Sequence, residues 1–132
     1  MQIAGVNQTL RVLTLGVLLV GVACGPPRRR GPDPDAATVI FINDTGEQAN
    51  VFAVVPGSQP VKIGTIYALR TETFRVPGIV TGRPNGVRIV ADLLARRGSR
   101  ATDPISLPPG SAVQVRLDAT LQLTVLPVSG RR

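Results

Sequence analysis

The chain has 132 residues, enough for one small domain, and 15 Lys or Arg against 8 Asp or Glu give it a formal charge of +7. It contains no histidine and a single cysteine, which excludes histidine-dependent catalytic triads, histidine-bearing zinc sites and internal disulfides. Aromatic residues make up only 3% of the chain, whereas 14 glycines and 12 prolines interrupt it, so the composition favours short strands over long helices.

The chain begins with an apolar segment. Arg11 precedes a largely apolar run over residues 12–23, which ends in small residues before Cys24. A helix needs about 20 apolar residues to cross a bilayer, and this run is shorter, so the pattern predicts a signal peptide over residues 1–23. An uncleaved single transmembrane helix is the alternative, reached when the run is extended back to Ile3.

The residues that end this run, Val20-Gly21-Val22-Ala23-Cys24, resemble the lipobox of bacterial lipoproteins. The resemblance implies cleavage between Ala23 and Cys24 and attachment of diacylglycerol to the Cys24 sulfur. A mature protein acylated in this way would stay tethered to a membrane and face the periplasm. Gly25 follows the cysteine in place of Asp, which by the same resemblance implies the outer membrane more than the inner one.

A Pro/Arg-rich linker is predicted after the cysteine, so that residues 24–37 contain the lipidation site and the tether. Its prolines favour an extended polyproline conformation, and it shows no apolar periodicity. Arg28, Arg29 and Arg30 lie near the lipidated end, where we expect them to contact anionic headgroups at the membrane surface. The alternative is a solvated linker with no specific contact.

Residues 38–128 are predicted to form one β-domain, followed by a basic tail over residues 129–132. Short apolar segments alternate there with turn signals, which is typical of an all-β sandwich. Strands are expected over residues 38–43, 49–55, 60–68, 71–77, 87–94, 104–107, 113–117 and 121–125. About seven to eight strands in this length predict an immunoglobulin-like or Greek-key β-sandwich, with a small barrel as the alternative.

Alternation within the strands assigns their faces. Phe74 and Val76 are expected inside, because they alternate with the polar residues Thr73 and Arg75. The inward residues expected in the following strand are Val87, Ile89, Ala91 and Leu93. The first two strands are expected to pair as a hairpin across Asn43–Gly46, and the last two as a hairpin across residues 118–120. Residues 96–103 are expected to be a polar loop.

Several of these segments together resemble small uncharacterised bacterial lipoproteins with an immunoglobulin-like domain. The segments that carry the resemblance are Val61–Thr65, Phe74–Pro77, Arg88–Asp92, Leu107–Gly110 and the closing hairpin. The resemblance implies the sandwich fold and assigns no chemistry.

No catalytic or cofactor motif emerges from the sequence. The eight carboxylates lie mainly in the linker and in predicted turns, where Asp and Glu commonly cap and form turns. Glycine-rich phosphate loops and the ligand spacing of calcium loops are missing. We therefore expect no enzyme, no metal and no cofactor. Nucleic acid is not an expected partner, because few aromatic side chains are available to stack on bases and the chain is expected to be exported.

The remaining candidate site is a set of arginines in two loops. Arg96, Arg97 and Arg100, together with Arg83, are predicted to dock on an acidic partner, with a solvated or aggregation-protecting sheet face as the alternative. The sequence thus predicts a non-enzymatic, lipid-anchored periplasmic module that binds protein through loops or strand addition, as an accessory or scaffolding subunit of an envelope or membrane complex. A small-ligand or glycan-binding lipoprotein is the alternative function.

Overall fold

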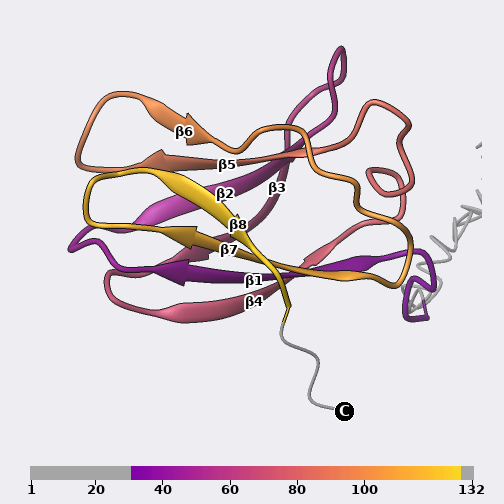
Figure 1. Ribbon diagram of the computed structural model, residues 1–132, viewed down its shortest axis with the longest axis horizontal. Helices are drawn as coiled ribbons and strands as arrows, with labels where there is room; N and C mark the ends of the chain where they lie inside the picture. Colours follow the sequence, from indigo (N-terminus) through magenta and orange to yellow (C-terminus); the bar gives the residue numbers. More distant parts are fainter. Residues whose placement is uncertain (1–30, 129–132) are drawn as a thin grey trace, which may run out of the picture.

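The computed structural model describes residues 31–128, which form two four-stranded β-sheets packed face to face (Figure 1). The all-β sandwich predicted from the sequence is confirmed, with eight strands in this part of the chain. The predicted signal peptide, Cys24, the arginines 28–30 and the basic tail lie outside the described residues.

Each sheet combines strands from both halves of the domain. The first sheet has the order β4-β1-β7-β8 and contains β1 (Ala37–Asn43), β4 (Thr71–Val76), β7 (Ala112–Leu117) and β8 (Leu123–Leu126). The second has the order β3-β2-β5-β6 and contains β2 (Ala49–Val54), β3 (Val61–Ile66), β5 (Arg88–Leu93) and β6 (Ser99–Ala101). Neighbours are antiparallel except β1 and β7, which are parallel. After β3, and after β4 in the other sheet, β5 returns to lie beside β2, the kind of return connection that Greek-key sandwiches contain.

The core lies between the sheets and consists mainly of Val, Ile, Leu and Ala. Every second residue of β1 is buried, with Phe41 as the largest side chain, and β5 buries Ile89, Ala91 and Leu93 as the alternation predicted. Each fully buried Val, Leu, Ile or Phe side chain contributes about 1.5–3 kcal/mol relative to exposure. Branched side chains suit a pleated surface, which explains how a chain so poor in aromatics fills a sandwich.

One flank of the sandwich is closed by an aromatic side chain over a glycine. Phe74 of β4 packs against Phe41, with ring centroids 6.4 Å apart, and its ring covers Gly64 of β3. A Cβ added at Gly64 would lie 3.0 Å or less from three ring carbons of Phe74. The absence of a side chain at Gly64 therefore lets β3 and β4 approach across the flank.

The hairpin expected between the first two strands is wrong. β1 pairs with β4 and β7, whereas β2 pairs with β3 and β5, so residues 44–48 cross from one sheet to the other. The physical reason lies in Asn43, whose side chain is buried and hydrogen-bonded to the backbone of this connection and of the β3–β4 connection. Those bonds hold residues 44–48 in a conformation that carries the chain from the first sheet to the second.

Three smaller differences concern the second half of the domain. Residues 96–103 contain the short strand β6, and residues 104–107 form one isolated bridge, Val87 with Ile105, in place of the expected strand. β8 begins at Leu123 because the Asp118 carboxylate accepts hydrogen bonds from the backbone of the turn and widens it.

Ordered contacts begin before the expected domain boundary at residue 38. The Asp33 carboxylate accepts hydrogen bonds from the backbone N–H of Gly78 at 2.7 Å and of Asp35 at 3.1 Å, and these bonds, with Arg75 nearby, lower the pKa of Asp33 from its ordinary value of 3.8. Arg75 also donates to the Asp33 carbonyl at 3.0 Å. The last residues of the predicted linker are thus held against the end of β4.

Candidate functional site

Four connections gather at one end of the sandwich, away from the start of β1 (Figure 1). They comprise residues 44–48, 67–70, 94–98 and 118–122, which we call the turn end. Because β1 runs from Ala37 toward this end, residues 31–36 join the domain at the opposite end. The turn end is therefore the part of the domain farthest from the N-terminal segment.

The buried side chain of Asn43 organises the turn end. Its amide donates to the carbonyls of Glu47 at 2.7 Å and Tyr67 at 3.0 Å, and its oxygen accepts from the Thr45 N–H at 3.0 Å and hydroxyl at 2.7 Å. All four hydrogen-bonding positions of the amide are thereby occupied. A fully satisfied buried amide of this kind makes the two connections that it joins rigid.

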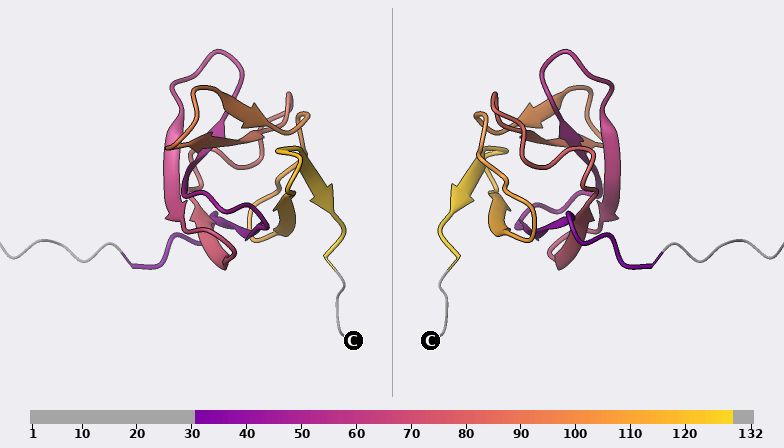
Figure 2. Two further views of the ribbon diagram at one scale, coloured as in Figure 1. Left: turned by 90° about the vertical axis from the view of Figure 1, so that its left-hand side faces the viewer. Right: turned by 90° about the vertical axis from the view of Figure 1, so that its right-hand side faces the viewer.

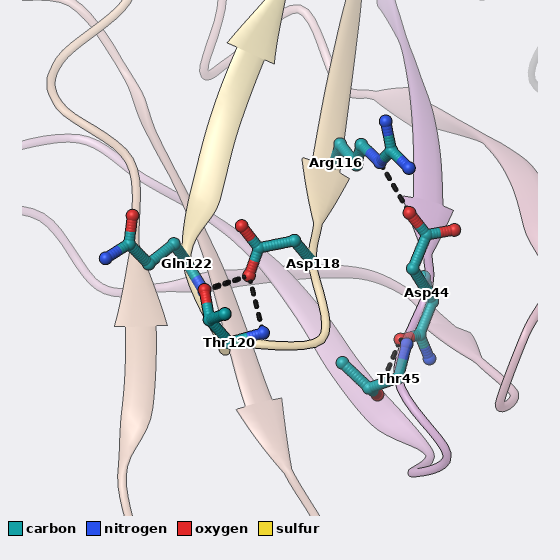
Figure 3. Close-up of polar contacts among 7 residues, drawn as sticks. Asp44, Thr45, Arg116, Asp118, Thr120 and Gln122 are labelled. Carbon is teal, nitrogen blue, oxygen red and sulfur yellow. Dashed lines mark hydrogen bonds and ion pairs between the residues drawn. The ribbon is translucent and has the colours of Figure 1, made fainter.

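Two ion pairs hold acidic residues of the 44–48 connection. Arg116 of β7 binds Asp44 (Figure 3), and Arg96 Nε lies 2.6 Å from Glu47 Oε1. The second carboxylate oxygen of Glu47 is buried and has no hydrogen-bond partner among the described residues. Arg116 and Arg96 are more than half exposed, so these pairs orient side chains more than they stabilise the fold.

The neighbouring β7–β8 turn is held by Asp118. Figure 3 shows its carboxylate accepting from the Thr120 hydroxyl and from the N–H of Thr120, and the Gln122 N–H also donates to it at 3.0 Å. The hydrogen bonds from Thr120 and Gln122, with Arg116 nearby, lower the pKa of Asp118 from its ordinary value of 3.8. The turn is thus built around an ionised carboxylate.

Three large apolar side chains are exposed around the same 44–48 connection. Tyr67 is 61% exposed, Leu69 73% and Leu94 56%. The Leu69 N–H donates to the Thr45 carbonyl and the Leu94 N–H to the Gln48 carbonyl, each at 3.1 Å, so both leucines flank one connection. We call Tyr67, Leu69 and Leu94 the apolar cluster.

Leu69 also has an unfavourable backbone conformation. Its φ is +55°, in the left-handed region that a Leu side chain disfavours by roughly 1–2 kcal/mol. Leu121 has a φ of +65°, but its side chain packs on the core, which offsets the strain. Leu69 is mostly exposed and gains no such compensation, so stability alone does not explain a leucine there.

The structure separates the predicted docking arginines. Arg96 is paired with Glu47, whereas Arg97 and Arg100 are exposed near the turn end. Arg83 precedes β5 and so lies at the opposite end, where its side chain donates to the Ile79 carbonyl. The four arginines therefore do not form one surface.

Sequence reasoning missed the apolar cluster. The only local signal was Leu69, an apolar residue between two expected strands, whereas Leu94 was placed at the end of the expected strand 87–94 and lies beyond β5 in the structure. Their proximity depends on which sheet each strand joins, and the sequence does not display that.

Two classes of feature are not found within residues 31–128. No three or more Cys, Asp or Glu side chains gather there closely enough to hold a metal ion. That part of the chain also has no helix with the length and apolar character of a membrane span.

Comparison with known proteins adds one distant likeness. The chain matches no protein-family model and no curated protein. It is similar to a solved structure described as the NMR structure of a protein from Eubacterium rectale, with 13% sequence identity and a TM-score of 0.47, over 76% of this chain and 96% of that one. A likeness at this level carries no inference about activity.

Proposed function

We propose that this chain is a non-enzymatic, lipid-anchored periplasmic module that binds protein and serves as an accessory or scaffolding subunit of an envelope or membrane complex. Its docking surface is the apolar cluster at the turn end. The observation that carries the proposal is Leu69, an exposed leucine in a left-handed conformation. Exposed apolar side chains held in strained backbone are a mark of binding sites, because neither burial nor backbone preference favours them.

The surroundings of Leu69 support docking of a protein. Tyr67 offers an aromatic face with a polar tip, a residue type enriched where interfaces gain most of their binding energy. Arg70 and Glu72 line a shallow hollow beside Tyr67, and they supply the polar rim that surrounds an apolar interface centre. Because Asn43 fixes the 44–48 and 67–70 connections, Tyr67 and Leu69 are held in place before a partner arrives.

The position of the cluster agrees with an anchor at Cys24. The chain enters the domain at the end opposite the turn end, so an acylated Cys24 would hold that opposite end toward the membrane. The apolar cluster would then face the periplasm, where a partner protein has access to it. Arg28, Arg29 and Arg30 would lie between the anchor and the domain, next to anionic headgroups.

A ligand-binding role has weaker support. An apolar pocket of about 270 Å³ opens near Ala53, Val61, Ile79 and Arg83, at the end opposite the cluster. Pockets for small molecules usually measure about 300–1,000 Å³, so this one falls just below that range. The hollow beside Tyr67 is larger, about 720 Å³, but Arg70 and Glu72 line it, whereas ligand pockets are lined mainly by apolar side chains. Neither space therefore combines the volume and the apolar lining of a typical small-ligand site.

The test is co-purification from native membranes. A tag after Arg132 is used to isolate the parent chain, Leu69→Asn and Ile79→Asn in mild detergent, and mass spectrometry identifies both the partners and the mature N-terminus. Ile79 is the matched control, because it is 71% exposed at the opposite end. We expect the parent and Ile79→Asn to recover one stoichiometric complex with acylated Cys24, and Leu69→Asn to recover at least about tenfold less, the effect of losing about 1.4 kcal/mol of binding.

The thermal midpoint separates this loss from misfolding. Asn tolerates a left-handed φ better than Leu, so Leu69→Asn should melt at the same temperature as the parent or higher. Equal recovery of the complex by Leu69→Asn and the parent would exclude the apolar cluster as the docking surface. Recovery of an acylated monomer alone would favour the ligand-binding alternative, and an intact Met1 would replace the lipid tether with a transmembrane helix.

A further inference from the structure

Within residues 31–128, the strand β8 is the margin of the first sheet and pairs with β7 alone, which leaves its outer edge unpaired in this part of the chain. Figure 2 shows it on the side of the molecule away from β3 and β4. Val125 of β8 is 37% exposed although it pairs with buried Val115 on the inner face, because the only strand beside this flank in the second sheet is the three-residue β6. Both the backbone edge and part of the inner face are therefore open here.

The register of the β7–β8 hairpin determines which backbone groups are free. The Asp118 N–H donates to the Gln122 carbonyl at 3.1 Å, so these two residues form a hydrogen-bonded pair. Bonded and non-bonded pairs alternate along an antiparallel ladder, which directs the N–H and C=O groups of Thr124 toward β7. The same groups of Leu123 and Val125 point away from the sheet. Pro127 comes next in this outward series, and it has no N–H to leave unpaired.

The other three edges of the sandwich are protected. β4 carries Glu72 and Arg75, and β3 carries Lys62 and a bulge in its pairing with β2. β6 is only three residues long and carries Arg100. Charges, bulges and short length are the usual means by which sheet edges avoid pairing with other chains. Residues 119–130, which include β8, contain no charged residue at all.

We propose that β8 is a dimerisation edge, at which β8 of one copy pairs antiparallel with β8 of a second copy. The two-fold axis passes beside Thr124. Leu123 of each copy then exchanges two hydrogen bonds with Val125 of the other, so the four outward groups of one copy satisfy the four of the other. The two first sheets join as one eight-stranded sheet.

A second copy of the chain fits the β8 edge because this edge is complementary to itself. Within β8 the free groups come from two residues, spaced two apart, and the two-fold mate matches all four of them. Isologous dimers are also the commonest assemblies. The interface also avoids the repulsion expected between chains of charge +7, because the paired segments are uncharged. The proposal goes beyond the docking function and does not depend on it. Antiparallel pairing directs the turn ends of the two copies in opposite directions, so the interface leaves Tyr67 and Leu69 of both copies uncovered.

The dimer should be weak in solution. A strand of four residues buries less surface than the 1,200 Å² or so of a stable standard interface, so we expect the dimer to dissociate on dilution. Sedimentation velocity of the full chain in mild detergent, over a dilution series, measures this. The parent should change from dimer to monomer mass, and Val125→Lys should be monomeric throughout, because a lysine on the edge must be desolvated on pairing.

A matched variant controls for a general effect of charge. Thr73 is exposed in β4, the other edge strand of the same sheet, and Thr73→Lys should dimerise like the parent. Both variants should keep the thermal midpoint of the parent within a few degrees, which separates loss of pairing from unfolding. Dimers of unchanged strength in Val125→Lys would refute β8 as the interface.

Cross-linking of the full chain in mild detergent gives an independent readout. Thr124 of the two copies would form a non-hydrogen-bonded pair with Cα atoms about 4.5 Å apart, within the range that a disulfide spans. Thr124→Cys should therefore form a disulfide-linked dimer under mild oxidation, whereas Thr73→Cys and the parent, which carries only Cys24, should not. A monomeric parent without this disulfide would overturn the proposal. So would a foreign protein cross-linked to Thr124→Cys, which would assign the edge to a heterologous strand.

Discussion

Single residues decide how closely the two sheets approach. Gly64 of β3 faces the ring of Phe74 in β4, and that ring also packs against Phe41 in β1. Because Gly64 has no side chain, the Phe74 ring can lie against β3 and β1 at the same time. At the turn end a single residue also has a large effect, because the buried amide of Asn43 makes four hydrogen bonds that join two connections. Neither residue carries chemistry. Gly64 sets the spacing at one flank, and Asn43 holds the connection that carries Tyr67 and Leu69.

Gly64→Ala should destabilise the domain by about 1–3 kcal/mol, because the new methyl group would overlap the Phe74 ring and force the flank open. Gly46→Ala is the control, since a Cβ at Gly46 meets no atom within 4 Å, and its effect should stay within about 0.5 kcal/mol. Chemical denaturation of both variants measures the difference. Equal free energies of unfolding would mean that the flank is not closed by Phe74.

At the scale of elements, alternation along a strand determines which side chains form the core. β5 shows this most clearly, because Ile89 and Ala91 are fully buried while Val90 between them and Asp92 after them face outward. The connections between strands follow no such simple pattern. The 44–48 segment crosses between sheets and the 118–122 segment turns within one, although both follow a strand and contain an aspartate.

Ile89→Asp should unfold the domain, because an unpaired carboxylate in an apolar core costs several kcal/mol, comparable to the whole stability of a small domain. Val90→Asp changes the adjacent, half-buried residue on the outer face and should leave a cooperative melting transition. Circular dichroism during heating distinguishes the two. A parent-like transition in Ile89→Asp would show that the register of β5 is wrong.

The whole molecule has two ends with different roles in the proposed function. The N-terminal segment is held at one end through Asp33, and the apolar cluster lies at the other. Aspartates that accept several hydrogen bonds are found at both ends, Asp33 beside β4 and Asp118 in the β7–β8 turn. Their shared chemistry makes the stability of the entire domain depend on pH.

Acid should destabilise the protein. The folded-state pKa values of Asp33 and Asp118 lie below the ordinary value of 3.8, so both carboxylates stabilise the fold above that pH and lose this contribution as the pH falls through their folded pKa values. The thermal midpoint should therefore decrease below about pH 4. In a double variant, Asp33→Asn with Asp118→Asn, the midpoint should be lower at pH 7 and should decrease less in acid. A parallel decrease in both proteins would assign the acid sensitivity to other groups.

The sequence alone determined the class of fold, most strand positions and the faces of β4, β5 and β7. A strand that buries one face alternates apolar and polar side chains with a period of two residues, and this alternation can be read along the chain without knowing which strands pair. The anchor predicted at Cys24 and the membrane-surface contact predicted for arginines 28–30 concern residues that the structure does not describe. Only the tertiary structure decided that β1 and β2 belong to different sheets, that Arg83 is far from Arg96, and that Tyr67, Leu69 and Leu94 gather around one connection. These features depend on how strands distant in sequence pair, and the same local turn residues are compatible with a hairpin or with a corner between sheets.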